Sequence, residues 1–312
     1  MSEFMYEVYD QPTKERFLNN IDLLSYPPRW FERIFEKSAQ LEKYNGKDLH
    51  SFTVNEILEF YKYLEPKSLS VLIVANANLT KYGQWAYGEH LITDGQNHFD
   101  EINTELLSEC LSKLKLKNSL LLGDDFKHLI NDMPNSQDKF VFYCLYEGIK
   151  GKNYEEIVKL RMEDLDFTDN TVHLPTRTMK VSRRFLHICA EADKEEKIEG
   201  ITGKPIEIRL KPSIYGGIFK EKNNSSGANL PKTVFSSISR NVRRFCNNPY
   251  ITSKSIRDSG LITALNERAE SNNMSVEELL KNTELCQDIL DKYQFKIKVK
   301  AVFLTDYGDF LV

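Results

Sequence analysis

Residues 146–167 read YEGIKGKNYEEIVKLRMEDLDF, and this stretch stands where the periodicity of the chain changes. Three successive helices are predicted before and within this stretch, in LLGDDFKHLINDM, DKFVFYCLYEGIKG and NYEEIVKLRMEDLDF. From Phe167 onward, FTDNTVHLPTRTMKVSRRFLHIC alternates like strands around a basic middle, which predicts a short β-hairpin or a three-stranded sheet. The fold expected here is therefore mainly α with a small β-hairpin or sheet.

The N-terminal part of the chain reads as a helical bundle. A first long helix is expected in PPRWFERIFEKSAQLEKYNG, which follows a Pro pair and ends at Gly46. A second, TVNEILEFYKYLEP, begins with a capping box of Thr53 and Glu56, and a third, largely apolar helix follows in SLSVLIVANANLTKYGQWAYGEHL. A chain of 312 residues is long enough for two domains. We predict these domains at residues 1–105 and 106–312.

Composition excludes several classes of protein. With 41% hydrophobic and 28% charged residues, the chain is typical of globular proteins. The acidic start predicts no signal peptide, and the lack of a long apolar run predicts no membrane span. The five Cys stand far apart, which favours a reducing bacterial cytoplasm over a disulfide framework. Neither the His nor the Cys residues have metal-ligand spacing, so we expect no metal and no cofactor.

Charge is distributed unevenly along the chain. Residues 1–111 carry 10 Lys and Arg against 18 Asp and Glu, whereas the remainder carries 32 against 28. A solvated face is the commoner explanation for any single basic cluster, but several clusters in one domain favour double-stranded DNA as the partner. The basic residues of these clusters are Arg177, Lys180, Arg183 and Arg184; Arg240, Arg243 and Arg244; Lys254 and Arg257; and Lys292, Lys296, Lys298 and Lys300.

The order of elements resembles that of the tyrosine recombinases, or phage integrases, over about residues 31–295. Residues 47–92 resemble the helical core-binding domain of that family; they read KDLHSFTVNEILEFYKYLEPKSLSVLIVANANLTKYGQWAYGEHLI. EGIKGKNYEEIVKLRMEDLDF follows the family's first catalytic motif with a three-residue insertion. The resemblance implies a two-domain architecture, a helical core-binding domain and a mixed α/β catalytic-like domain, that encloses duplex DNA.

The resemblance also implies counterparts for the family's catalytic groups. In the family, a Tyr hydroxyl attacks a DNA phosphodiester, two Arg residues hold its nonbridging oxygens, a hairpin Lys protonates the leaving oxygen, and His residues assist. Matched motif by motif, the first Arg of the family corresponds to Lys150, and the hairpin Lys corresponds to Arg177 or Lys180. The family's HxxR box corresponds to Lys254 and Arg257. The later His or Trp corresponds to Asn282 or Glu284, and the nucleophile corresponds to Tyr293.

Only Arg257 and Tyr293 match the family's residue types. Lys150 keeps a positive charge but lacks the bidentate fork of Arg, and Arg177 holds its proton too firmly for an efficient general acid. The sequence therefore predicts that the chain is not an enzyme and that strand cleavage is lost. Two plainer interpretations stay open: Tyr293 is an ordinary helix-face aromatic, and Arg257 pairs with a carboxylate such as Asp258.

Positive charge is preserved at three replaced positions, Lys150, Arg177 and Lys254, which favours DNA binding without cleavage. The sequence also resembles those of the integrase-like master repressors of SPbeta-type temperate phages. That resemblance implies a sequence-specific prophage transcriptional repressor that maintains lysogeny at the bacterial nucleoid. The alternative function is a divergent but active recombinase with Tyr293 as nucleophile. The signal that releases the protein from DNA is open among a peptide, a protein anti-repressor and degradation.

Two regions leave further alternatives. The acidic first domain has either a local DNA-contacting patch, with Lys67, Ser70, Asn76 and Lys81 as candidates, or a role in protein contacts. The C-terminal KIKVKAVFLTDYGDFLV alternates like a strand and is expected either to fold back or to pack on a neighbouring subunit. The second outcome would allow self-association through the tail, and with it a third hypothesis, an assembly factor that works through protein contacts.

Overall fold

The computed structural model describes residues 4–21, 28–199, 207–222 and 238–312, the last range without residues 240, 243 and 247. It divides the chain into two compact units, Met1–Leu116 and Lys117–Val312, and each is described by itself. The predicted domain boundary after residue 105 falls inside helix α5 (Thr104–Ser108) of the first unit. None of the helices in the described ranges is long and apolar enough to cross a membrane.

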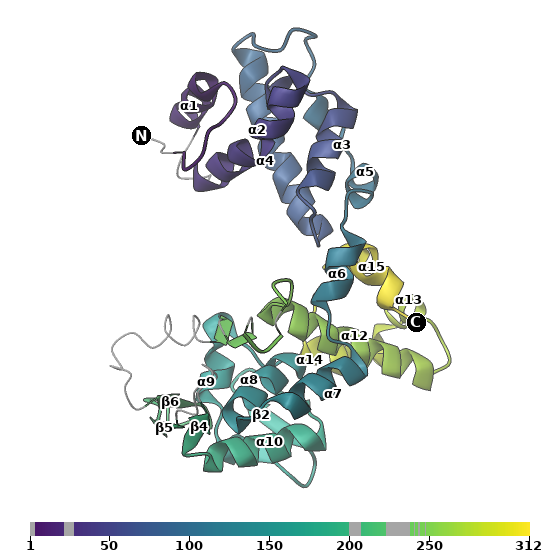
Figure 1. Cartoon of the computed structure of the whole chain (residues 1–312). Coiled ribbons are helices and arrows are strands. Elements are labelled where there is room, and N and C mark those ends of the chain that lie inside the picture. Colours follow the sequence, from purple (N-terminus) through teal and green to yellow (C-terminus); the bar gives the residue numbers. More distant parts are fainter. Residues whose placement is uncertain are drawn as a thin grey trace. The chain divides into compact units, whose positions relative to one another are not determined.

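The first unit is helical, as predicted (Figure 1). Besides α5, it contains α1 (Gln11–Asn20), α2 (Pro28–Asn45), α3 (Val54–Tyr63), α4 (Leu69–Gly88), the start of α6 (Lys113–Ser119), and short 3-10 turns at Leu49–Ser51 and His98–Glu101. The capping box expected at the start of α3 is present, because the Glu56 carboxylate accepts from the Thr53 amide at 2.7 Å. Phe31 and Phe35 of α2 are completely buried and form the centre of the bundle.

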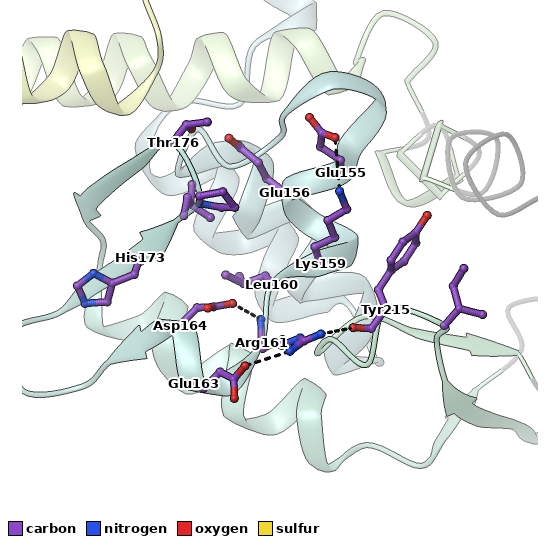
Figure 2. A pocket seen from close by; sticks show the side chains of 13 residues that line it. Glu155, Glu156, Lys159, Leu160, Arg161, Glu163, Asp164, His173, Thr176 and Tyr215 are labelled. Atoms are coloured by element: carbon purple, nitrogen blue, oxygen red, sulfur yellow. Dashed lines mark hydrogen bonds and ion pairs between the residues drawn. The ribbon is translucent and has the colours of Figure 1, made fainter.

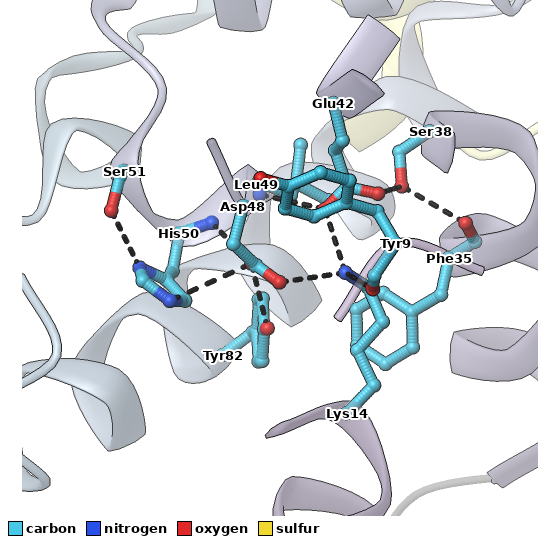
Figure 3. A network of polar contacts seen from close by, with 10 residues as sticks. All are labelled: Tyr9, Lys14, Phe35, Ser38, Glu42, Asp48, Leu49, His50, Ser51 and Tyr82. Carbon is cyan, nitrogen blue, oxygen red and sulfur yellow. Dashed lines mark hydrogen bonds and ion pairs between the residues drawn. The ribbon is translucent and has the colours of Figure 1, made fainter. Parts of the chain in front are cut away.

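A buried ionic network connects four segments of this bundle (Figure 3). The ammonium of Lys14, on α1, has no solvent exposure and donates to Glu42 Oε1 and Asp48 Oδ2, each at 2.7 Å. The hydroxyl of Tyr82, on α4, donates to the other oxygen of Asp48 at 2.8 Å. Burial raises the pKa of Glu42 to about 7, although the charge of Lys14 opposes this. Lys14 therefore joins α1 to α2, to the segment after it and, through Asp48, to α4.

Replacing the buried cation will destabilise the first unit. We predict that Lys14→Met lowers its free energy of unfolding by about 3 kcal/mol or more, because the carboxylates of Glu42 and Asp48 stay buried without their partner. Both tryptophans of the chain, Trp30 and Trp85, lie in this unit, so urea denaturation followed by Trp fluorescence reports on it directly.

The matched control is Lys43→Met. Lys43 belongs to the same unit, but its ion pair with Glu7 is largely exposed, so we expect a change of at most about 1 kcal/mol. A loss for Lys14→Met no larger than that of the control would contradict a structural role for the buried network.

The second unit is built around helix α8 (Ser136–Tyr146), which packs against both α10 (Arg183–Lys194) and α12 (Ser253–Ser271) (Figure 1). Phe140, Phe142 and Leu145 of α8 are completely buried. The other described helices of this unit are α7 (Gly123–Asp132), α9 (Glu155–Lys159), α13 (Val276–Leu279), α14 (Gln287–Lys292) and α15 (Lys300–Tyr307). The central position of α8 fixes the place of the loop that follows it.

Two small antiparallel sheets accompany these helices. The first contains β1 (Leu165–Asp166), β2 (Thr171–Leu174) and β3 (Arg177–Lys180) in that order, with Leu174 opposite Arg177 across the hairpin. The second contains β4 (Lys197–Glu199), β5 (Glu207–Pro212) and β6 (Lys220–Lys222), and it was not predicted. The mainly helical fold with a small sheet is thus confirmed.

The first sheet corrects the predicted strands. The helix expected through Phe167 ends at Lys159, and its last residues supply β1. The residues around Phe185 were expected in a strand but belong to α10. The Ser182 side chain caps this helix by accepting from the Phe185 amide at 3.2 Å, and Phe185 and Cys189 are buried one turn apart. Helix capping and helical burial therefore override the strand-like alternation of the amino-acid sequence.

The predicted C-terminal strand is also wrong. Ile297–Val299 form a 3-10 turn, and α15 follows, with Phe303 and Tyr307 buried one helical turn apart. The tail folds back onto its own unit, where the Val312 carbonyl accepts from the Val276 amide at 2.8 Å. The helix expected over VEELLKNTELCQDILDKYQF is divided into α13, a 3-10 turn and α14.

Two further sequence predictions concern residues around the second sheet. The loop predicted in KEKNNSSGANL begins with β6, and its remainder lies outside the described residues. Most of the helix predicted in TVFSSISRNVRRFC also lies outside them, although Ile238 and Val242 are described and buried.

Candidate nucleic-acid interface

The loop after α8, residues 147–151, carries Lys150 and depends on two glycines. Gly148 has φ +83° and Gly151 has φ +66°, values that favour glycine over other residues. A Cβ at Gly148 would also lie 2.9 Å from the Lys292 carbonyl oxygen. The two glycines therefore allow the chain to turn sharply at the end of α8 and to pass close to α14.

Glu156 ties this loop to the β-hairpin. Its carboxylate accepts from Arg177 through two contacts, Nη1 to Oε1 at 2.5 Å and Nη2 to Oε2 at 3.0 Å, and from the Lys150 amide at 2.9 Å. The side chains of Glu156 and Arg177 are only 8% and 11% exposed. Arg177 also donates to the Gly148 carbonyl at 3.1 Å. The guanidinium of Arg177 is thus bound within the protein, whereas Lys180, the other hairpin candidate, is exposed.

Lys150, Lys254 and Arg257 form a cation cluster at the start of α12. Thr252 caps this helix, so that Lys254 and Arg257 lie on its first turns. Burial lowers the pKa of the half-buried Lys150, and the positive charges of Arg257 and Lys254 lower it further. The Lys150 ammonium lies 5.3 Å from the ring centre of Tyr154, whose hydroxyl is 2.5 Å from the Ser253 hydroxyl at the start of α12. The structure therefore brings together the counterparts of both family arginines and of the HxxR histidine.

Asp258 is the carboxylate of this cluster. It is 7% exposed and accepts from the Lys254 ammonium at 2.7 Å. For Arg257, where pairing with Asp258 or another carboxylate was one open interpretation, the structure shows a bond to the carbonyl of Tyr293. The cluster thus combines three cations with one nearly buried anion.

The hydroxyl of Tyr293 is bonded to the protein backbone. Tyr293 is 2% exposed, and its hydroxyl donates to the Tyr146 carbonyl at 2.7 Å. Gly260 of α12 makes room for this bond, since a Cβ there would lie 1.9 Å from the Tyr146 oxygen. Burial raises the pKa of Tyr293 well above its usual value. In this structure Tyr293 therefore has the buried position of a core side chain.

The remaining sequence-predicted residues are scattered around the second unit. Asn282 and Glu284 are exposed beyond α13. Lys180, Arg183 and Arg244 are exposed, Arg184 donates to the Asn131 side chain, and Arg240 and Arg243 lie outside the described residues. Contact of these residues with DNA stays a prediction.

The candidates in the first unit differ in their surroundings. Lys67 and Lys81 are half-buried and Ser70 is exposed. Asn76 is bonded inside the bundle, because it accepts from the Tyr61 hydroxyl at 2.8 Å and donates to the Phe99 carbonyl at 3.2 Å. The side chain of Asn76 is therefore already used by the fold.

A cavity of about 700 Å³ borders the hairpin formed by β2 and β3 (Figure 2). Four carboxylates line it, those of Glu155, Glu156, Glu163 and Asp164. Arg161, one of its cations, is engaged with Glu163 at 3.1 Å and with the Tyr215 carbonyl at 3.2 Å. The surplus of negative charge disfavours phosphate here. Within the described ranges, no group of three His, Cys, Asp or Glu is placed to hold a metal ion.

Three residues of the site escaped the sequence analysis: Glu156, Asp258 as partner of Lys254, and Tyr307. The signal for Glu156 was its position six residues after Lys150, in the same stretch. Tyr307 had no such signal, because the tail was expected to be a strand. Its hydroxyl donates to Asp258 at 2.6 Å from a helix far along the chain.

The Glu156–Arg177 pair is expected to be essential for the second unit. We predict that Glu156→Gln lowers the free energy of unfolding by about 3 kcal/mol, because the buried guanidinium of Arg177 loses its counter-charge. Glu155→Gln is the matched control, since Glu155 is exposed and lies 3.7 Å from Lys159. Urea denaturation followed by far-ultraviolet circular dichroism measures both variants. Equal effects of the two substitutions would contradict the structural role of Glu156.

Comparisons with known proteins agree with this organisation. A family model described as "MrpR, N-terminal core-binding domain" matches residues 8–88, and one described as "MrpR, C-terminal catalytic domain" matches residues 121–308. The SPbeta prophage-derived uncharacterized protein YopR of Bacillus subtilis (strain 168) is 25% identical over 268 residues, which cover 81% of this chain and 80% of YopR.

Two other similarities are more limited. Transposase A from transposon Tn554 of Staphylococcus aureus is 29% identical over 82 residues, which cover 25% of this chain and 22% of the transposase. The integrase from mycobacterium phage Brujita is 12% identical in sequence, with 95% of this chain and 98% of that chain covered and a TM-score of 0.31. At that score the likeness establishes neither fold nor function.

The paired core-binding and catalytic-domain matches, on a fold that gathers the recombinase counterparts at one cation cluster, define a tyrosine-recombinase-like protein. The chain belongs to the MrpR family.

Proposed function

We propose that this protein binds double-stranded DNA in a sequence-specific manner as a transcriptional repressor of a prophage, and that it does not cleave the DNA. One observation carries the proposal. Lys150 lies beside the start of α12, which carries Lys254 and Arg257, whereas the hydroxyl that a recombinase would need there, that of Tyr293, is bonded to the Tyr146 carbonyl. A phosphate-binding site is thereby separated from its nucleophile.

The chemistry of the cluster supports binding over cleavage. Three cations attract a DNA phosphate, and this attraction requires no defined transition-state geometry. Cleavage, in contrast, requires a reactive hydroxyl and donors that follow the charge of the transition state. Lys150 and Lys254 are point charges without a bidentate fork, and the hydroxyl of Tyr293 has a raised pKa. Each of these features lowers the expected rate of strand cleavage.

The role of prophage repressor rests on a different kind of support. The protein is similar along most of its length to a prophage-derived relative. A DNA-binding protein without cleavage activity that is encoded by a prophage has gene regulation, and hence maintenance of lysogeny, as its simplest use. The role in transcription is therefore proposed together with non-cleaving DNA binding, and an experiment on bacterial DNA tests both.

The first test separates a regulator from a recombinase. Purified protein is incubated with fragments of a bacterial genome that carries the prophage, and the bound fragments are sequenced and run on a denaturing gel. We expect a few enriched sites in promoter regions and no covalent protein–DNA adduct. An adduct that disappears in Tyr293→Phe would overturn the proposal in favour of an active recombinase. No enrichment of any fragment would exclude sequence-specific binding.

The second test concerns the cation cluster. We predict that Lys150→Gln or Lys254→Gln weakens DNA binding and reduces the dependence of log affinity on log salt concentration by about one unit for each lost phosphate contact. Fluorescence anisotropy over a salt series measures both quantities.

Lys281→Gln is the matched control for Lys254→Gln. Both lysines are exposed and form an ion pair with a carboxylate four residues away, Lys254 with Asp258 within α12 and Lys281, just after α13, with Glu277. Lys281 is not part of the cation cluster, so we expect its replacement to leave the salt dependence unchanged. Identical salt slopes for Lys254→Gln, Lys281→Gln and the unmodified protein would place the phosphate contact elsewhere.

A further inference from the structure

Helix α15 brings Tyr307 directly to the carboxylate of the cation cluster. The hydroxyl of Tyr307 donates to Asp258 Oδ2 at 2.6 Å, and the ammonium of Lys254 donates to the same oxygen at 2.7 Å. Tyr307 is 5% exposed, and Lys254 Nζ lies 3.5 Å from its hydroxyl and 5.9 Å from the centre of its ring. One carboxylate oxygen thus has two donors, one neutral and one charged.

The two donors, Lys254 and Tyr307, differ in how easily each can move away from the Asp258 carboxylate. The Lys254 side chain is 66% exposed and can turn toward solvent, whereas the Asp258 side chain is 10% exposed and cannot follow it. Burial and the nearby Asp258 carboxylate raise the pKa of Tyr307, so its hydroxyl keeps the proton that it donates. Tyr307 is therefore a permanent donor, and Lys254 is an exchangeable one.

A phosphate that binds Lys254 competes with Asp258 for the ammonium, and it gains most when the ammonium turns away from Asp258. Without another donor, this exchange would leave a nearly buried carboxylate unsatisfied beside an arriving anion, and both effects oppose binding. With Tyr307 in place, the Asp258 oxygen retains a hydrogen bond of 2.6 Å after Lys254 has turned away. The tail therefore lowers the free-energy cost of the exchange.

We propose that Tyr307 is a positioning residue for phosphate binding: by satisfying Asp258, the C-terminal helix of the same chain releases Lys254 to a DNA phosphate. This inference rests on the proposed DNA-binding function and deepens it. It assigns the tail a role in its own unit, where Asn266 of α12 holds it by donating to the Phe310 carbonyl at 2.9 Å and accepting from the Val312 amide at 3.2 Å.

The test is a double-mutant cycle in the full-length protein. Tyr307→Phe keeps the ring, and with it the packing on Phe303 at 5.1 Å between ring centres, but removes the donor. Asp258→Asn removes the negative charge that the donor satisfies. The affinity of each single variant and of the double variant is measured by anisotropy with a fluorescein-labelled duplex of random sequence, about 30 base pairs long, because the phosphate contribution is independent of sequence.

We expect Tyr307→Phe to weaken binding about tenfold, as for a lost hydrogen bond to a charged group. In the Asp258→Asn background the same substitution should have almost no effect, so that the double variant binds at least as tightly as the unmodified protein. Tyr146→Phe is the matched control. It removes a hydroxyl bond of 2.9 Å to Thr263, on the same helix α12, and should not change the affinity. Thermal melting checks that every variant folds.

Two outcomes would overturn the inference alone: unchanged binding by Tyr307→Phe, or weakened binding that Asp258→Asn does not restore, which would give the tail a purely structural role. Lys150→Gln, measured in parallel, separates this failure from failure of the proposed function. If Lys150→Gln weakens binding while Tyr307→Phe does not, only the role of Tyr307 is lost. If the unmodified protein does not bind the duplex, both proposals fall.

Discussion

The second unit depends on the carboxylate of Glu156. It is nearly buried and holds Arg177 of the hairpin together with the backbone amide of Lys150. Through Arg177 it also reaches the Gly148 carbonyl, so the hairpin, α9 and the loop after α8 share one ionic centre. Lys150 is thereby fixed at the cation cluster, where only its side chain is left to meet a ligand. Removing either partner of this nearly buried ion pair would leave an uncompensated charge in a low-dielectric environment and destabilise the unit.

Under the proposed function, this arrangement accounts for a recombinase-like site that binds DNA without cleaving it. The hairpin residue Arg177 is bonded within the protein, and the hydroxyl of Tyr293 donates to the backbone of α8. Positive charge lies at Lys150, in the loop after α8, and at Lys254 and Arg257 on α12. We therefore propose that the site keeps a local field for an anion, while the groups that a recombinase would use to move a proton or attack phosphorus serve packing.

The helical bundle and the hairpin could be predicted from the sequence, because capping boxes and apolar spacing are local signals. Lys150, Lys254 and Arg257 were grouped only through the resemblance to recombinase motifs. The role of Glu156 and the bond between Tyr293 and Tyr146 could not be predicted, since they join residues that are distant in sequence and whose burial depends on the complete core. The prediction for the tail failed for another reason: KIKVKAVFL alternates like a strand, and the spacing of Phe303 and Tyr307, four residues apart, places both on one face of a strand or of a helix, so it did not reveal the helix.

The central claim is that the cation cluster holds a DNA phosphate in a site that has no available nucleophile. Methylphosphonate interference tests it most directly, because replacing single phosphates by neutral groups shows which of them the protein requires. On a duplex that the protein enriches, we predict a phosphate whose neutralisation weakens binding by the unmodified protein but not by Lys254→Gln, and no covalent adduct at that position. The same interference pattern for both proteins, or an adduct there, would contradict the account.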